Sequence, residues 1–232
     1  MSQRLILCSV LLSFSLTACE TAEDGNIEAA RACVDNAAKS AFTNPDAAST
    51  AASGCEAKLG SVTTKEAQRV RFGIYLIVDK KLHRMAEMVD AMKTNSGGLD
   101  GMNVALSVLV VPGGATRSQS YVNAGNGSAS SGIKKVASLI NMATNLNDCS
   151  TFGAGATGVQ TAVAACAGTN PALVATMARD LKSSACASPS DNTSTDANNP
   201  CVKAKAFTDN CAGGQTDAAI ATCLSNYLAT PH

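Results

Sequence analysis

The clearest pattern in the chain is a stripe of apolar residues between Thr63 and Lys93. Its members recur at spacings of three and four residues: Tyr75, Val78, Leu82, Met85, Val89 and Met92, widened by Ile74, Ile77 and Met88. This spacing is typical of an amphipathic helix, and Thr64 stands where an N-cap would begin it. A stripe this wide indicates a helix packed into a bundle. We therefore predict one continuous helix over Thr63–Lys93.

A second apolar run, Leu99 to Val111, comes before Pro112-Gly113-Gly114. Its length and β-branched end suit either a short buried helix or a strand, and it is too short to span a bilayer. Residues 115–132 are rich in Gly, Ser and Asn, which predicts a long loop between two helical subdomains. Such a loop is either a flexible connector, the reading we favour, or a binding loop.

Helical patterns resume after this loop. They cover Ile133–Leu146, Val159–Ala167, Pro171–Ala185 and Cys201–Tyr227, the last broken at Gly213-Gly214, with a polar insert at Ser188–Pro200. Together with the earlier patterns they predict an all-α fold of antiparallel helical hairpins, stapled by disulfides. The hairpins would form a bundle or a short solenoid of the tetratricopeptide type, a comparison of architecture only. The expected subdomains are residues 27–114 and 133–232.

The number and spacing of the cysteines distinguish disulfide bonding from zinc ligation. Eight cysteines lie downstream of the N-terminal region: Cys33, Cys55, Cys149, Cys166, Cys186, Cys201, Cys211 and Cys223. In a chain that reaches an oxidising compartment, an even set of cysteines predicts four disulfides. Zinc ligation is the alternative, but the chain has no CxxC pair and only two histidines. We expect disulfides and no metal.

Helical hairpins narrow the pairing of these cysteines. Cys33 and Cys55 flank the turn signal Asn44-Pro45 symmetrically, so two antiparallel helices would bring them level. Cys201 and Cys223 have the same separation around Gly213-Gly214. By the same reasoning Cys149 would pair with Cys186 across the Gly168–Pro171 turn, which leaves Cys166 for Cys211. Cys201 and Cys211 would share a helix and lie too far apart to pair.

Short words recur in the two segments that we expect to be stapled hairpins. Cys33-Val34, Ala41-Phe42-Thr43 and Asp46-Ala47-Ala48 return in the same order after Cys201, although with different spacing. Either a duplicated hairpin or coincidence in an Ala-rich chain explains this recurrence.

One group of polar residues could carry chemistry. Asp79, His83 and Glu87 follow one another at intervals of four on the predicted long helix, as a metal or proton-transfer site would require. The adjacent Lys80, Lys81 and Arg84 favour a solvated charged surface instead.

Motifs for catalysis and cofactor binding are missing from the sequence. The chain lacks GxSxG, P-loop and HExxH patterns. Gly153-Ala-Gly155-Ala-Thr-Gly158 matches a dinucleotide-binding string, but a polar segment precedes it where a strand is needed. We therefore predict no catalytic residue and no cofactor. The formal net charge is zero, and aromatic residues make up 3% with no Trp, so we expect no nucleic-acid partner.

The N-terminus has the pattern of an export signal. Arg4 precedes the apolar core Leu5–Leu16, and Glu20, Glu23 and Asp24 follow, which predicts a cleaved signal rather than a membrane span. The tetrapeptide Leu16-Thr17-Ala18-Cys19 resembles the lipobox of bacterial lipoproteins. That resemblance covers about the first 19 residues and implies cleavage before Cys19, with acyl chains on its sulfur and new amine. An ordinary signal peptide is the alternative.

A lipidated Cys19 would make the membrane itself the first partner, because two or more acyl chains give a stable anchor. The resemblance implies a signal peptide at residues 1–18 and a lipidated tether at 19–26. Glu20, in place of the Asp that favours inner-membrane retention in enteric-type lipoproteins, indicates the outer membrane. We expect a non-enzymatic interaction or scaffold role with an envelope protein partner. The alternative is a small-ligand or solute-binding subunit that serves a transporter.

Overall fold

The protein is described here from a computed structural model, which defines residues 22–85, 104, 106–151, 157–186, 193–196, 199, 201–202, 205, 211 and 216–229. The predicted all-α fold is confirmed: the described residues form helices packed on one another and contain no strand. Within this described part of the chain, no helix is both long enough and apolar enough to cross a membrane.

The N-terminal group contains α2 (Ala22–Ala38), α3 (Pro45–Ser53), α4 (Cys55–Leu59) and α5 (Lys65–Val78). The turn predicted at Asn44-Pro45 is present, because the Asn44 side chain caps α3 by accepting from the Ala47 N–H and Pro45 opens the helix. Thr64 caps α5 in the same way, as predicted. Since α2 begins at Ala22, residues 22–26 of the expected tether are helical, which corrects that boundary.

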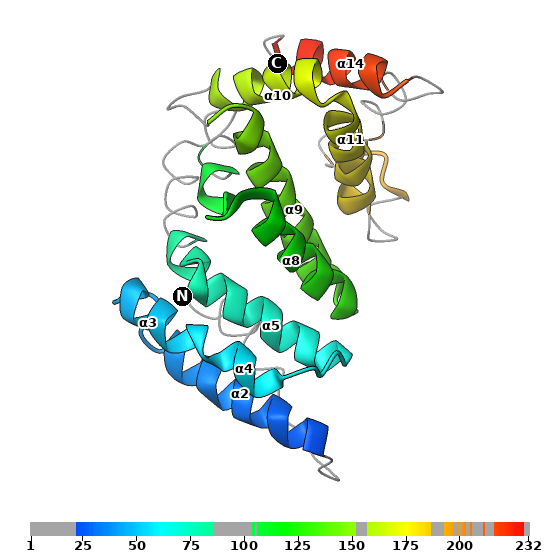
Figure 1. The fold of residues 1–232 in the computed structure, drawn as a ribbon. Helices are drawn as coiled ribbons and strands as arrows, with labels where there is room; N and C mark the ends of the chain where they lie inside the picture. Colours follow the sequence, from blue (N-terminus) through cyan, green and yellow to red (C-terminus); the bar gives the residue numbers. More distant parts are fainter. Residues whose placement is uncertain are drawn as a thin grey trace.

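A hairpin of α8 (Gly114–Gly127) and α9 (Ser131–Cys149) forms the middle of the molecule (Figure 1). The prediction of a long loop over residues 115–132 is therefore wrong. Gly, Ser and Asn are common in loops, but in α8 the small residues let the two helices approach closely. Ser118 and Gly125 are both buried, and the Ser130 side chain caps α9.

The C-terminal group contains α10 (Thr157–Thr169), α11 (Pro171–Ala185) and α14 (Asp217–Ala229). Asn170 caps α11 by accepting from the Leu173 N–H at 3.2 Å, and Pro171 opens that helix. The bounds of α11 agree with the sequence prediction. Gly213 and Gly214, predicted to break the last helix, lie outside the described residues, as do Gly153 and Gly155.

All eight cysteines downstream of residue 22 form disulfides, and the pairing of Cys33 with Cys55 is confirmed. The other three predicted pairings are wrong. The structure joins cysteines that are neighbours in sequence: Cys149–Cys166, Cys186–Cys201 and Cys211–Cys223. Cys201 and Cys223, expected to staple a second hairpin, are therefore not paired with each other.

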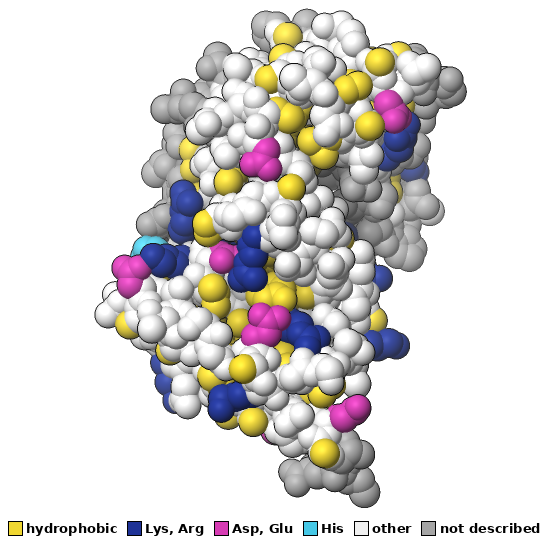
Figure 2. Space-filling view, in the orientation of Figure 1, with side chains coloured by type: hydrophobic (Ala, Val, Ile, Leu, Met, Phe, Trp, Pro, Cys, Tyr) yellow, Lys and Arg dark blue, Asp and Glu magenta, His cyan; other side chains and the backbone are white. Residues whose placement is uncertain are grey.

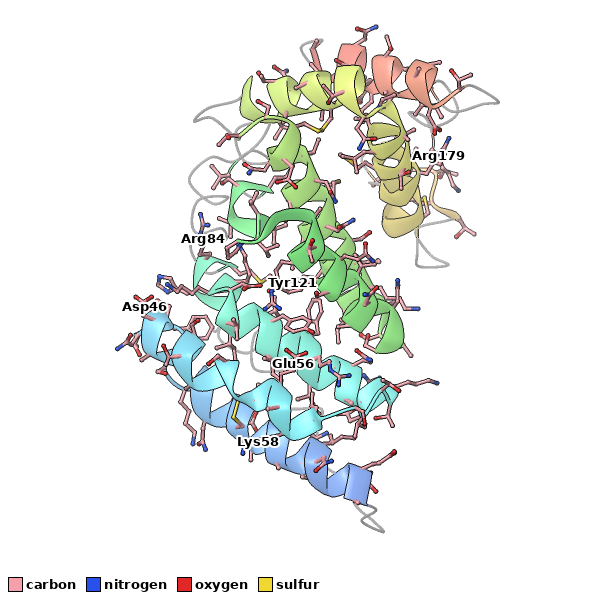
Figure 3. All side chains as sticks on the ribbon, viewed as in Figure 1. Asp46, Glu56, Lys58, Arg84, Tyr121 and Arg179 are labelled. Atoms are coloured by element: carbon pink, nitrogen blue, oxygen red, sulfur yellow. A yellow bond between two sulfur atoms is a disulfide. The ribbon has the colours of Figure 1, made fainter. Side chains whose placement is uncertain are left out.

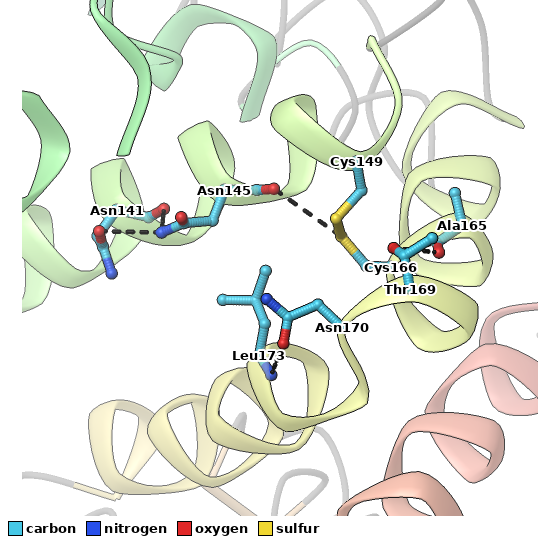
Figure 4. The surroundings of a disulfide bond; sticks show 8 residues. All are labelled: Asn141, Asn145, Cys149, Ala165, Cys166, Thr169, Asn170 and Leu173. Atoms are coloured by element: carbon cyan, nitrogen blue, oxygen red, sulfur yellow. Dashed lines mark hydrogen bonds between the residues drawn. A yellow bond between two sulfur atoms is a disulfide. The ribbon is translucent and has the colours of Figure 1, made fainter. Parts of the chain in front are cut away.

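The Cys149–Cys166 bond shows why the local pairing prevails (Figure 4). Cys149 is the last residue of α9, and α10 folds back so that Cys166 reaches it, with the Asn145 carbonyl 3.8 Å from the Cys166 sulfur. The prediction instead assumed that α9 and α11 would lie level across the Gly168–Pro171 turn. That turn joins α10 to α11, so Cys149 meets α10 first.

Helices pack mainly on their neighbours in sequence: α2–α5 together, α5 on α8, α8 on α9, α9 on α10, and α10 with α11 and α14. The result is a layered array in which the Ala22 end of α2 and the α10–α14 pair lie at opposite ends (Figure 1). One continuous apolar core runs through it, from Ile27 in α2 to Leu224 in α14. This is the near-linear arrangement of helical hairpins expected for a short solenoid.

Candidate functional site

The predicted long helix over Thr63–Lys93 breaks at Asp79. α5 ends at Val78, Lys80 has a left-handed backbone with φ of 56°, and helical geometry resumes at Lys81. Residues 86–93 lie outside the described residues. Asp79 and His83 are therefore on different helical segments, so the expected stack of Asp79, His83 and Glu87 on one helix is wrong at its first step.

The break turns Asp79 into the core. Its side chain is only 7% exposed, and its carboxylate accepts two hydrogen bonds from Arg117 of α8, at 2.9 and 3.4 Å. The Tyr121 hydroxyl donates to the same carboxylate at 2.9 Å. The expectation of a solvated charged surface therefore fails for Asp79. Hydrogen bonding to Asp79, together with its negative charge, raises the pKa of Arg117 although burial opposes it.

Aromatic rings enclose this ion pair. The Arg117 guanidinium lies 4.2 Å from the centre of the Tyr75 ring, and Tyr121 makes edge contacts with Phe72 and Tyr75 at 5.5 Å. The Tyr75 hydroxyl donates to Glu56 at 2.8 Å. Burial, then the bond to Glu56, raises the pKa of Tyr75 to about 12; burial, then the nearby Asp79, raises that of Tyr121 further.

Two views show where this cluster lies. Tyr121 points from α8 toward α5, and Glu56 approaches from α4 (Figure 3). On the same face of the molecule, hydrophobic side chains are visible at the centre, bordered by basic and acidic ones (Figure 2). The cluster joins the N-terminal group to the α8–α9 hairpin, and its buried, mutually bonded side chains make it structural.

Lys81 is also buried, with 1% of its surface exposed. Its ammonium donates to the carbonyl oxygen of Val108 at 2.8 Å and to that of Val110. Burial, then the positive charge of Arg84, lowers the pKa of Lys81 to about 8, against the opposing effect of Asp79. The expectation of a surface charge is therefore wrong for Lys81 as well.

The sequence left open whether the run Leu99–Val111, which contains the two carbonyls bonded to Lys81, is a helix or a strand. Its described residues 104 and 106–109 are helical, and Val110 and Val111 continue without regular structure. Leu106, Val108, Leu109 and Val111 are buried. Within the described residues, the Leu99–Val111 run is a short buried helix rather than a strand.

An open cleft of about 590 Å³ lies beside Lys81. Three segments line it: the end of α5 with the helical turn that follows, residues 110–114, and the last turn of α9. Its apolar lining comes from Val78, Val110, Val111 and Pro112, and its polar lining from Asp79, Lys80, Lys81, Arg84, Asn147 and Asp148. This cleft of mixed character is the candidate functional site.

The predicted site residues are distributed as follows. Cys19, the expected lipid attachment, lies outside the described residues, and the eight cysteines that follow it in the chain form disulfides. Among the described residues, no group of three or more His, Cys, Asp or Glu side chains is placed to hold a metal. Arg117 and Tyr121 were missed because they fall in the presumed loop, although their spacing of four is a helical signal.

Comparison with known proteins adds no further guide. No family model, no curated protein and no solved structure matches the chain. Function has to be inferred from the residues of this chain.

Proposed function

We propose that the chain is a lipid-anchored protein of the bacterial envelope, with the outer membrane as its site, and that it acts by non-enzymatic binding to an envelope protein. Export and anchoring are supported by the signal and lipobox pattern that ends at Cys19. Four disulfides are also characteristic of proteins that mature in an oxidising compartment.

The observation that carries the scaffold role is the position of the N-terminal end of α2. Ala22 is three residues from Cys19 and begins α2 at one end of the array, whereas α10 and α14 lie at the other end (Figure 1). A lipid on Cys19 would hold the N-terminal helices near the membrane and present the C-terminal helices away from it. The disulfides would keep that presentation rigid.

Two exposed aromatic residues allow a matched test. Phe42, in the turn after α2, is 42% exposed, and Tyr227, in α14, is 43% exposed. A photo-reactive phenylalanine analogue at either position, introduced into the full chain in cells, samples the N-terminal group of helices at Phe42 or the C-terminal group at Tyr227. We expect a specific cross-linked protein at Tyr227 and none at Phe42. Equal cross-linking at both positions, or none at Tyr227, would contradict the proposed presentation.

A second candidate function is small-ligand binding for a transporter. The cleft beside Lys81 favours it, because about 590 Å³ lies within the ordinary range of ligand pockets and the lining mixes apolar and charged groups. Mass spectrometry of small molecules released from protein extracted from membranes tests this candidate. Small-ligand binding predicts a compound bound in stoichiometric amount to the protein, and the scaffold role predicts none.

A further inference from the structure

The charged groups around the cleft fall into two sets. Three are already engaged: Asp79 with Arg117, Lys80 with Asp46, and Lys81 with two backbone carbonyls. The other two are Arg84 and Asp148, which are exposed and make no side-chain hydrogen bond or ion pair with another described residue. With respect to the described residues, the lining therefore offers one cation and one anion without a side-chain partner.

These two side chains come from different walls. Arg84 lies on the helical turn after α5, and Asp148 lies on the last turn of α9. The apolar part of the lining is formed by Val78, Val110, Val111 and Pro112. A ligand that satisfies all three features carries an anionic group, a cationic group and an apolar chain.

We propose that the cleft binds a small apolar zwitterion, a free amino acid or a short peptide, with its carboxylate at Arg84 and its ammonium at Asp148. This inference rests on the second candidate function and names its ligand class. Arg84 suits a carboxylate because its guanidinium presents paired donors, and Asp148 can accept from an ammonium.

The surroundings of each group support this assignment. Lys81 also lines the cleft and adds positive charge near Arg84, and the charge of Asp79 is balanced by Arg117. On the other wall, Gly114 leaves room for the Asp148 carboxylate. A Cβ at Gly114 would lie 3.4 Å from its Oδ2, and the glycine has a left-handed φ of 59°.

Three related probes separate the contributions of the charges. L-leucine carries both charges, 4-methylpentanoate lacks the ammonium, and 3-methylbutylamine lacks the carboxylate. Calorimetric titration of the full lipoprotein in detergent should show leucine binding, with each single-charge analogue weaker by about tenfold. The dipeptide Leu-Leu distinguishes the two ligand sources, because its charges are farther apart: tighter binding than leucine assigns the cleft to peptides, and weaker binding to free amino acids.

Because Arg84 and Asp148 are exposed, replacing them should leave the fold intact. Arg84→Gln and Asp148→Asn should each weaken binding of the preferred zwitterion by about tenfold. Asp148→Asn should also remove the preference for leucine over 4-methylpentanoate. Lys58→Gln is the matched control, since Lys58 is exposed on α4 and lies far from Arg84 (Figure 3). Binding to this variant should be unchanged.

The results that would overturn the zwitterion inference differ from those that would overturn small-ligand binding. If no probe binds at millimolar concentration, or if binding survives both cleft variants, the inference is overturned. If 4-methylpentanoate binds the unmodified protein as tightly as leucine and Arg84→Gln abolishes both, the zwitterion is wrong while small-ligand binding stands. A stoichiometric bound compound without both charges has the same meaning.

Discussion

Replacing Gly125 with alanine tests the contact between α8 and α9. A Cβ at Gly125 would lie 2.7 Å from the Cβ of Ala137, with the Ile133 carbonyl oxygen at 3.5 Å. The Ala137 Cβ is attached directly to the α9 backbone and cannot rotate away. Gly125→Ala therefore forces the two helices apart.

The size of the effect follows from two opposing terms. Overpacking of a well-packed contact costs about 1–3 kcal/mol, and alanine gains about 1 kcal/mol over glycine inside a helix. We expect a net loss of up to about 2 kcal/mol for Gly125→Ala. Gly73→Ala in α5 is the matched control, because its Cβ would lie 3.8 Å from Val34 Cγ1, an ordinary contact. The free energy of unfolding of Gly73→Ala should be higher than that of the unmodified protein by about 0.5–1 kcal/mol.

Urea unfolding of the oxidised proteins, followed by circular dichroism, gives the free energy of unfolding of each variant. The reasoning predicts that the two glycine variants differ in sign. If Gly125→Ala is as stable as Gly73→Ala, α8 does not pack closely on α9.

Three further predictions concern buried charge and the disulfides. Arg117→Met should cost about 3 kcal/mol because it leaves Asp79 buried without its partner, and combining it with Asp79→Asn should cost less than the sum of the single changes in the same unfolding assay. The pKa of Lys81 is lowered to about 8 from 10.5, so the unfolded chain binds more protons than the folded chain between these pH values. The free energy of unfolding should therefore rise from pH 8 toward 10, and this rise should disappear in Lys81→Met. A rise that persists in Lys81→Met would contradict the assignment. Replacing Cys149 and Cys166 together by serine should lower stability by about 3 kcal/mol, and an unreduced peptide map that lacks their linkage would contradict the pairing.

Caps and turns could be predicted from the sequence because they depend on residues that are neighbours in the chain. The Asn44-Pro45 turn, the Thr64 cap and the bounds of α11 depend on residues that act within one helical turn. The Cys33–Cys55 pairing followed from the same turn. All-α architecture needed only the apolar spacing.

The errors arose where distant residues decide the structure. The apolar stripe continues past Asp79, so its period hides the break, and the contacts that accompany the turn come from Arg117 and Tyr121 of another helix. Residues 115–127 are helical because Gly125 and Ser118 fit against α9, which composition does not reveal. The candidate cleft could not be predicted, because its lining joins three segments that are separate in sequence.

The measurement that tests the central proposal most directly is the intact mass of the full chain, expressed in a bacterium that processes lipoproteins and extracted from its membranes. Before reduction, the account predicts a chain that begins at an acylated Cys19. After reduction without alkylation, it predicts the gain of eight hydrogens from the four disulfides. An unlipidated N-terminus at any residue, or free thiols at most of these cysteines, would contradict anchoring or stapling respectively.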